Sequence, residues 1–270
     1  MGGEVFKKLN EHIGRVCGQL PDQRRSGHNE QYEMADFVKS AFGVFFFQHQ
    51  SMLDYQRKMK MKEKRGRSNL ETVFGVQNVP SDTWIRAQLD GIGPEGLSPL
   101  FNLTLKTAEE AGLLQGYRVL DSGVLIALDG VTTYYHSALA GTIVKPGNTS
   151  VMPVMAEMIH NGDGEKKQDC ELTAAKRWLK SHSEEYRWLK PTLLGDDLYS
   201  HEPFCRQVLE AGYSFIFTCK DSTHPWLKET VANSEPEEWR RREWNGRRHM
   251  VYTKNPLARG RVGERRTDTV

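Results

Sequence analysis

The sequence predicts an α/β protein, in which an N-terminal helical region is followed by an incomplete mixed sheet with flanking helices. Apolar residues recur at helical spacing in the first 115 residues. From residue 116 on, short runs rich in β-branched and aromatic residues alternate with helical stretches. We therefore expect a helical region over 1–115, a sheet-based core over 116–254, and a polar tail over 255–270 that is disordered.

The composition is typical of a folded, intracellular chain. Of the 270 residues, 27% are charged and 10% are aromatic, which is compatible with a packed core and excludes a wholly disordered chain. No run approaches the 18 apolar residues of a membrane-spanning helix, so we expect no membrane partner. The N-terminus has no signal-peptide pattern, and the four cysteines form no CxxC pair, so we expect a cytoplasmic location.

Two stretches of the N-terminal region have distinct helical patterns. Residues 34–60 are predicted to form one helix, because Phe37, Ala41, Val44 and Phe45 share one helical face, as in an ordinary core helix. Residues 69–90 predict two short helices, the second of them capped by Ser81 or Asp82. This pair fits either a plain αα-hairpin or a helix-turn-helix. In a helix-turn-helix, the residues presented to DNA would be Thr83, Arg86 and Gln88.

The connection to the core and the core itself are predicted from turn signals and apolar runs. Residues 91–99 are rich in Gly and Pro and are expected to be a linker. The helix over 200–212 is expected to be capped by Ser200, to have Pro203 in its first turn and to end at Gly212. The strand–helix–strand unit at 192–220 predicts a parallel crossover. The other predicted elements are strands at 124–130, 132–144 and 249–253 and a helix at 169–183.

Two runs of positive charge favour a nucleic-acid partner. They read RKMKMKEKRGR (57–67) and WRRREWNGRRH (239–249), and the second contains two tryptophans. Cations with interleaved aromatic rings suit phosphate contacts and base stacking, although a solvated charged face explains either run alone. The candidate DNA-binding residues are Lys58, Lys60, Lys62, Lys64, Arg65, Arg67, Arg86, Lys220, Arg240, Arg241, Arg242, Arg247 and Arg248.

Carboxylates end two of the predicted strands. Asp129 ends one strand, and Asp196 with Asp197 ends another. Because ligands of open α/β sheets bind beyond the carboxyl ends of strands, two such carboxylates could hold Mg²⁺ or Mn²⁺ for phosphoryl transfer. Two plainer interpretations stay open. Asp129-Gly130 has the pattern of a hairpin turn, and Asp196-Asp197 has that of a helix cap.

Four runs, taken in order, resemble insertion-sequence transposases of the DDE class. They are LIALDG (125–130), DGEKKQDCELTAAKRWL (163–179), GDDLYSH (195–201) and FIFTCKDSTHPWL (215–227), and residues 51–92 resemble the region upstream in that family. The resemblance implies a ribonuclease H-like core that cuts double-stranded DNA at element ends and joins them to target DNA. It also implies Mg²⁺ held by Asp, Asp and Glu, a nucleoid-associated location and a possible homodimer.

The resemblance also assigns roles to individual residues. Asp129 matches the first catalytic aspartate and Asp196 the second, with Asp197 as the reserve for the second. Lys220 matches a family lysine for which we expect a phosphate contact.

Two departures from the family pattern predict a truncated, catalytically incomplete copy. The run DGVTTYYHSALAG lacks the longer cysteine-containing stretch of the family, which indicates an internal deletion. The catalytic glutamate of the family lies on a helix well downstream of the second aspartate. Here Glu229 and Glu243 precede the last predicted strand, and Glu264 lies in the polar tail. The alternatives are a non-catalytic DNA-binding remnant and a metal-dependent nuclease that uses two aspartates.

Overall fold

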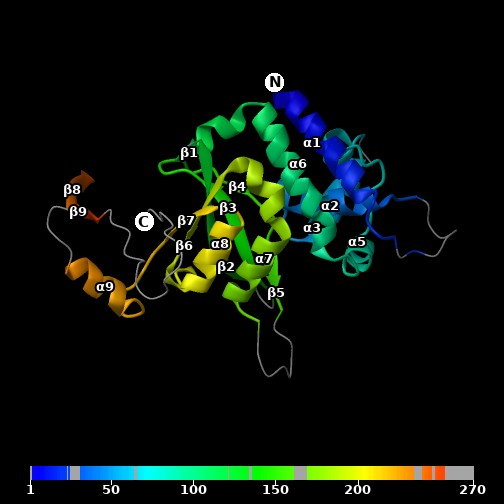
Figure 1. Ribbon diagram of the computed structural model, residues 1–270. Helices are drawn as coiled ribbons and strands as arrows, with labels where there is room; N and C mark the ends of the chain where they lie inside the picture. Colours follow the sequence, from blue (N-terminus) through cyan, green and yellow to red (C-terminus); the bar gives the residue numbers. More distant parts are fainter. Residues whose placement is uncertain are drawn as a thin grey trace. The chain divides into compact units, whose positions relative to one another are not determined.

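The computed structural model describes residues 2–22, 24, 31–63, 66–120, 122–133, 136–160, 169–233, 239–244 and 247–252. The chain divides into two compact units. The first comprises Met1–Arg118 and Met152–Met155, and the second comprises Val119–Val151 and Ala156–Val270. The predicted class is confirmed, because helices come first and a mixed sheet with flanking helices follows (Figure 1).

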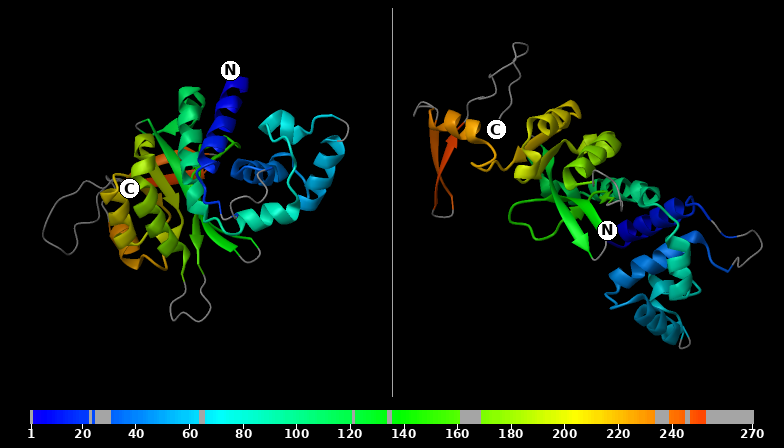
Figure 2. Two further views of the ribbon diagram at one scale, coloured as in Figure 1. Left: turned by 90° about the vertical axis from the view of Figure 1, so that its right-hand side faces the viewer. Right: turned by 90° about the horizontal axis from the view of Figure 1, so that it is seen from below.

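The first unit is built from helices (Figures 1 and 2). Most of the predicted boundaries in residues 69–90 are confirmed, because Ser81 accepts a hydrogen bond from the Trp84 backbone N–H and caps the second helix. The expected linker at 91–99 is wrong in part, since a 3-10 turn begins at Pro94 and a helix begins at Ser98. The helices are α1 (Gly2–Cys17), α2 (Met34–Phe46), α3 (Met52–Glu63), α4 (Asn69–Phe74), α5 (Asp82–Leu89) and α6 (Ser98–Glu110).

The single helix predicted over 34–60 is wrong, because the chain leaves the helical conformation after Phe46. Gln48 has a φ of 56° in the left-handed region, and the Ser51 hydroxyl accepts a hydrogen bond from the Asp54 backbone N–H at the start of α3. Phe45 was also expected on the buried face, but its side chain is 78% exposed. It follows buried Val44 by one position, or about 100° of helix rotation, which carries it off the buried stripe.

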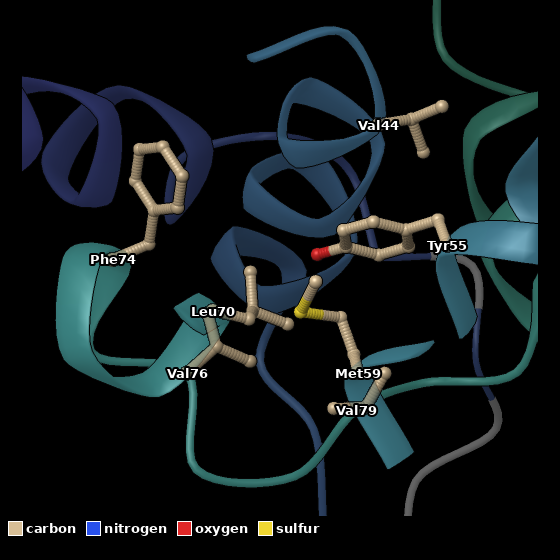
Figure 3. Packing of buried hydrophobic residues seen from close by; sticks show 7 residues of the cluster. All are labelled: Val44, Tyr55, Met59, Leu70, Phe74, Val76 and Val79. Atoms are coloured by element: carbon tan, nitrogen blue, oxygen red, sulfur yellow. The ribbon is translucent and has the colours of Figure 1, made fainter. Parts of the chain in front are cut away.

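A cluster of buried side chains joins α2, α3 and α4 (Figure 3). Gly43 of α2 allows the close approach, because a Cβ at this position would lie 2.7 Å from the Tyr55 hydroxyl on α3. The Phe74 ring of α4 adds edge contacts with Phe42 and Phe46 of α2. The members of the cluster are Val44, Tyr55, Met59, Leu70, Phe74, Val76 and Val79.

Within the described residues, the main sheet has seven strands. Its order is β4-β3-β2-β6-β7, with β1 paired to β2 and β5 paired to β3. The strands are β1 (Arg118–Val119), β2 (Gly123–Thr133), β3 (His136–Val144), β4 (Met152–Pro153), β5 (Glu157–Ile159), β6 (Pro191–Gly195) and β7 (Ser214–Phe217). The helices of the second unit are α7 (Glu171–Tyr186), α8 (Glu202–Glu210) and α9 (Pro225–Ala232).

The pairing of these strands gives the sheet its mixed character. Strand β2 runs antiparallel to β3 and parallel to β6, and β6 runs parallel to β7. The predicted parallel unit of strand, helix and strand is confirmed as β6–α8–β7. Helix α7 contacts β3 and β5, while α8 contacts β7, and the two helices contact each other (Figure 1). Parallel pairing places the carboxyl ends of β2, β6 and β7 along one edge.

Three of the expected boundaries around this edge are wrong. Asp129-Gly130 does not form a hairpin turn, because Asp129 pairs with Ala140 and β2 continues to Thr133. The strand predicted from 132 therefore begins only at His136. Ser200 does not cap α8, since its hydroxyl donates to the Asp197 carbonyl oxygen and the N-cap position is His201. Pro203 in the first turn and Gly212, with a φ of 79°, just beyond the helix are as predicted.

A second, two-stranded sheet contains most of the C-terminal basic run. Strands β8 (Trp239–Trp244) and β9 (Arg247–Tyr252) pair antiparallel, and β9 includes most of the strand predicted at 249–253. The predicted tail at 255–270, with Glu264, lies outside the described residues. None of the helices that the structure describes has both the length and the apolar character needed to cross a membrane.

Candidate acidic site at the carboxyl edge of the sheet

The register of the sheet places the two predicted aspartates at the same edge. In the parallel pair of β2 and β6, the last paired residues are Ala127 and Leu194, and β6 ends at Gly195. Continued by two residues past this pair, the register leads to Asp129 in β2 and to Asp196, the first residue after β6. Both residues are exposed to solvent. Two exposed carboxylates therefore lie at the carboxyl edge of the sheet, which is where open α/β sheets bind ligands.

Asp196 is held in place by the turn that it begins. It is the N-cap of a 3-10 turn, η4 (Asp197–Tyr199), and its Oδ1 accepts a hydrogen bond of 2.9 Å from the Leu198 backbone N–H. The capping interpretation is therefore confirmed for Asp196, although it caps a 3-10 turn rather than α8. Capping and ligand binding are compatible, because a carboxylate has two oxygens and several lone pairs.

Asp197, the reserve candidate, has a different environment. Its side chain is buried, and its oxygens accept hydrogen bonds from the Lys220 backbone N–H at 2.7 Å and from the Thr223 hydroxyl at 2.7 and 2.8 Å. The Lys220 N–H, and then the Thr223 hydroxyl, hold the pKa of this carboxyl group below its usual value. Both oxygens of the Asp197 carboxylate already accept hydrogen bonds within the protein, so Asp196 is the better candidate for ligand binding.

A third carboxylate, Glu171, reaches the same strand end and was missed from the sequence. Glu171 is the first residue of α7, a position at which an acidic side chain complements the helix dipole. It accepts a hydrogen bond from the hydroxyl of buried Tyr199, and a Cβ at Gly130 would collide with its carboxylate. Burial, followed by the hydrogen bond to Glu171, raises the pKa of Tyr199, and the charges of Asp196 and Asp129 act in the same direction.

The three carboxylates do not form one cluster. Successive residues of a strand point to opposite faces, so Glu171, which lies over Gly130, is on the other face of β2 from the Asp129 side chain. Accordingly, no group of three His, Cys, Asp or Glu side chains within the described ranges could hold a metal ion. Among the described residues at this edge, Asp129 and Asp196 provide the hard oxygen donors that Mg²⁺ and Mn²⁺ prefer.

Lys220 lies at the same edge, in the connection from β7 to α9. The Thr218 backbone N–H donates to the Gly195 carbonyl oxygen, which joins the ends of β7 and β6. The Lys220 N–H is bound by Asp197, and the residue is exposed. The structure thus places a cation of the predicted DNA-binding set next to the segment that contains Asp196.

The other predicted DNA-binding residues lie elsewhere. Lys58 and Lys60 are exposed on α3, and Lys58 forms an ion pair of 2.9 Å with Asp54. Arg67 is 3.4 Å from Glu71, and Arg86 is exposed on α5. Lys62 belongs to α3, and Lys64 and Arg65 lie outside the described residues. Strands β8 and β9 contain Arg240, Arg241, Arg242, Arg247 and Arg248.

No family model matches this chain, and no curated protein gives a significant match. The geometry of the strand ends and the residue pattern therefore carry the functional argument.

The cysteines are expected to differ sharply in reactivity. Cys170, at the N-cap of α7, is exposed, and a hydrogen bond with the Thr173 hydroxyl lowers its pKa. Cys17 is fully buried, and burial raises its pKa to about 11. Because the thiolate is the reactive form, we expect iodoacetamide at pH 8 to alkylate Cys170 first and Cys17 only after unfolding. Mass spectrometry of the labelled peptides over time measures both rates. Equal rates in the native protein would contradict this assignment, and equal rates in denaturant are the control.

Proposed function

We propose that this protein is a DDE-type transposase by descent, with a ribonuclease H-like core that is catalytically incomplete in this chain. The observation that carries the proposal is the parallel pairing of β2 with β6, whose register, continued past Ala127 and Leu194, leads to Asp129 and Asp196. The same proposal is supported by the resemblance to insertion-sequence transposases of the DDE class, which follows the family's order at residues 125–130, 163–179, 195–201 and 215–227. The substrate would be double-stranded DNA, in a cytoplasmic, nucleoid-associated setting, and a homodimer is a possible form.

The residues at this edge suit phosphoryl transfer. Asp129 and Asp196 would hold Mg²⁺ or Mn²⁺, which activates a water or 3′-hydroxyl and stabilises the leaving oxygen when it is bound. The Leu198 N–H fixes the orientation of the Asp196 side chain. The Lys220 ammonium group offers a positive charge to a backbone phosphate of DNA.

The incomplete character follows from the number of ligands. Within the part of the chain that the structure describes, Asp129 and Asp196 are two carboxylates where the family resemblance implies three, and Glu171 is held by Tyr199 on the other face of β2. We therefore expect weak metal binding and no strand transfer. Exposed cations on α3 and α5 support the alternative of a non-catalytic DNA-binding remnant. The two exposed aspartates at the carboxyl edge of the sheet support the two-aspartate nuclease.

Metal binding and plasmid nicking together test this proposal. We expect Mn²⁺, followed by electron paramagnetic resonance, to bind weakly to the wild-type protein and to lose this binding in Asp129→Asn and Asp196→Asn. Asp221→Asn is the matched control, because Asp221 is an exposed aspartate paired with Lys228. Nicking of supercoiled plasmid is expected to stay at background in all four proteins.

Each result distinguishes the alternatives. Mn²⁺ binding that survives both substitutions would refute the proposed metal site. Robust nicking that needs Asp129 and Asp196 would refute the incomplete character and favour the nuclease. In that case Glu171→Gln would test whether this carboxylate contributes to the activity. DNA binding without metal binding would favour the remnant.

A further inference from the structure

Two connections meet at the carboxyl edge of the sheet. One leads from β6 to α8 through residues 196–201, and the other leads from β7 to α9 through residues 218–224. They are neighbours because β6 and β7 are adjacent parallel strands, with Gly195 paired to Phe217. The first connection contains Asp196, and the second contains Lys220.

A buried carboxylate joins these two connections. Asp197 comes from the first, and it accepts hydrogen bonds from the Lys220 backbone N–H and the Thr223 hydroxyl of the second. His224 of the second connection lies with Nε2 3.4 Å from Asp197 Oδ1 and 2.6 Å from the Ser200 hydroxyl. The Ser200 hydroxyl donates to the Asp197 carbonyl oxygen at 2.6 Å, which closes the network.

This network restricts the backbone on both sides. Asp197 is only 6% exposed. Removal of a donor therefore leaves a buried carboxylate oxygen without one of its hydrogen-bond partners, which costs free energy. The bond from Lys220 fixes the backbone position from which its ammonium group extends. Asp196, one residue before the network, is fixed separately by the Leu198 N–H. The candidate metal ligand and the candidate phosphate contact therefore lie on two connections that the hydrogen bonds of Asp197 join.

We propose that Asp197 and Thr223 are positioning residues, which hold Lys220 beside Asp196 so that its ammonium group meets a DNA phosphate at this edge. The inference rests on the proposed function, because it takes DNA as the ligand. It assigns Asp197 a role in positioning a cation rather than in binding metal. Thr223 acts through Asp197, and neither residue touches the substrate.

The test is a double-mutant cycle on DNA affinity. Thr223→Val keeps the side-chain shape and removes the hydroxyl donor, whereas Thr223→Ser keeps the donor. Binding of a fluorescent DNA duplex is followed by anisotropy over a range of salt concentrations. Loss of one phosphate contact lowers the slope of log affinity against log salt by about 0.9.

We expect Lys220→Ala to lower the slope by about this amount. Thr223→Val is expected to lower it in the same direction, Thr223→Ser to match the wild type, and the double variant to match Lys220→Ala alone. Lys228→Ala, which removes a nearby exposed cation on α9, is the charge-matched control. Thermal unfolding by circular dichroism checks that Thr223→Val folds, and hydrogen exchange of the Lys220 amide reports directly on its bond to Asp197.

The failures of the two proposals are distinguishable. If Lys220→Ala weakens binding but Thr223→Val does not, or if their effects add, the positioning role is wrong and the DNA-binding function stands. Wild-type DNA affinity in Thr223→Ser, together with reduced DNA affinity in Thr223→Val, supports the role of the hydroxyl. A wild-type protein that does not bind duplex DNA at any salt concentration overturns both proposals.

Discussion

Replacing Trp178 by alanine is expected to lower the free energy of unfolding by about 3–5 kcal/mol. Trp178 lies on α7, is fully buried and stacks on Tyr186 with ring centroids 6.0 Å apart. Truncation removes a large apolar surface and leaves a cavity that the rigid sheet and helices cannot fill. A loss of this size is a large part of the stability of an ordinary domain.

Urea unfolding followed by circular dichroism measures this effect. The matched control is Trp84→Ala, because Trp84 lies on α5 of the other unit and its side chain is 38% exposed. We expect the control to cost about 1 kcal/mol, mainly through lost stacking on Phe37. Equal losses for the two tryptophans would show that α7 does not pack as the structure describes.

Replacing Gly123 by alanine is the second large expected effect, with a loss of about 1–3 kcal/mol or more. A Cβ at this position would collide with the backbone carbonyl oxygen of Lys190. Lys190 itself has a φ of 50°, and it directly precedes β6. Because the obstacle is backbone rather than the end of a flexible side chain, relief requires β2 and β6 to separate at their first paired residues, Val124 and Pro191.

Gly116→Ala is the matched control for this substitution. Gly116 lies in a 3-10 turn over Leu113–Tyr117, and a Cβ there would have no heavy atom within 4 Å. We expect thermal unfolding to show a lower melting temperature for Gly123→Ala and a nearly unchanged one for Gly116→Ala. A tolerated Gly123→Ala would contradict the close approach of these two strands.

Local signals in the sequence predicted much of the fold. Ser81 capped α5 as predicted, and the run over 192–220 formed the parallel unit β6–α8–β7. Both depend on nearest-neighbour chemistry: a side-chain cap in one case and apolar strands with a short connection in the other.

The mispredicted features have two different causes. The apolar pattern ran through 34–60, but a local cap at Ser51 starts a separate helix. Asp129-Gly130 has the sequence of a turn, yet pairing with β3 keeps both residues in a strand. In this second case tertiary context overrode a local preference.

The candidate site was predictable only in part for the same reason. Asp129 and Asp196 stood out because each follows an apolar strand. Glu171 did not stand out, because its contact with Tyr199 joins residues 28 positions apart on different elements. The distinction between Asp196 and Asp197 likewise needed the partners Lys220 and Thr223, which no local pattern reveals.

The parallel pairing of β2 with β6 has a consequence for how the chain is made. Strand β2 can pair with β3 as soon as both have left the ribosome, since they are adjacent in sequence. Residues Val124–Ala127 of β2 do not meet their β6 partners until α7 and β6 have been synthesised. An open apolar strand edge is a template for pairing with another nascent chain, so slower translation lengthens the interval in which aggregation competes with folding.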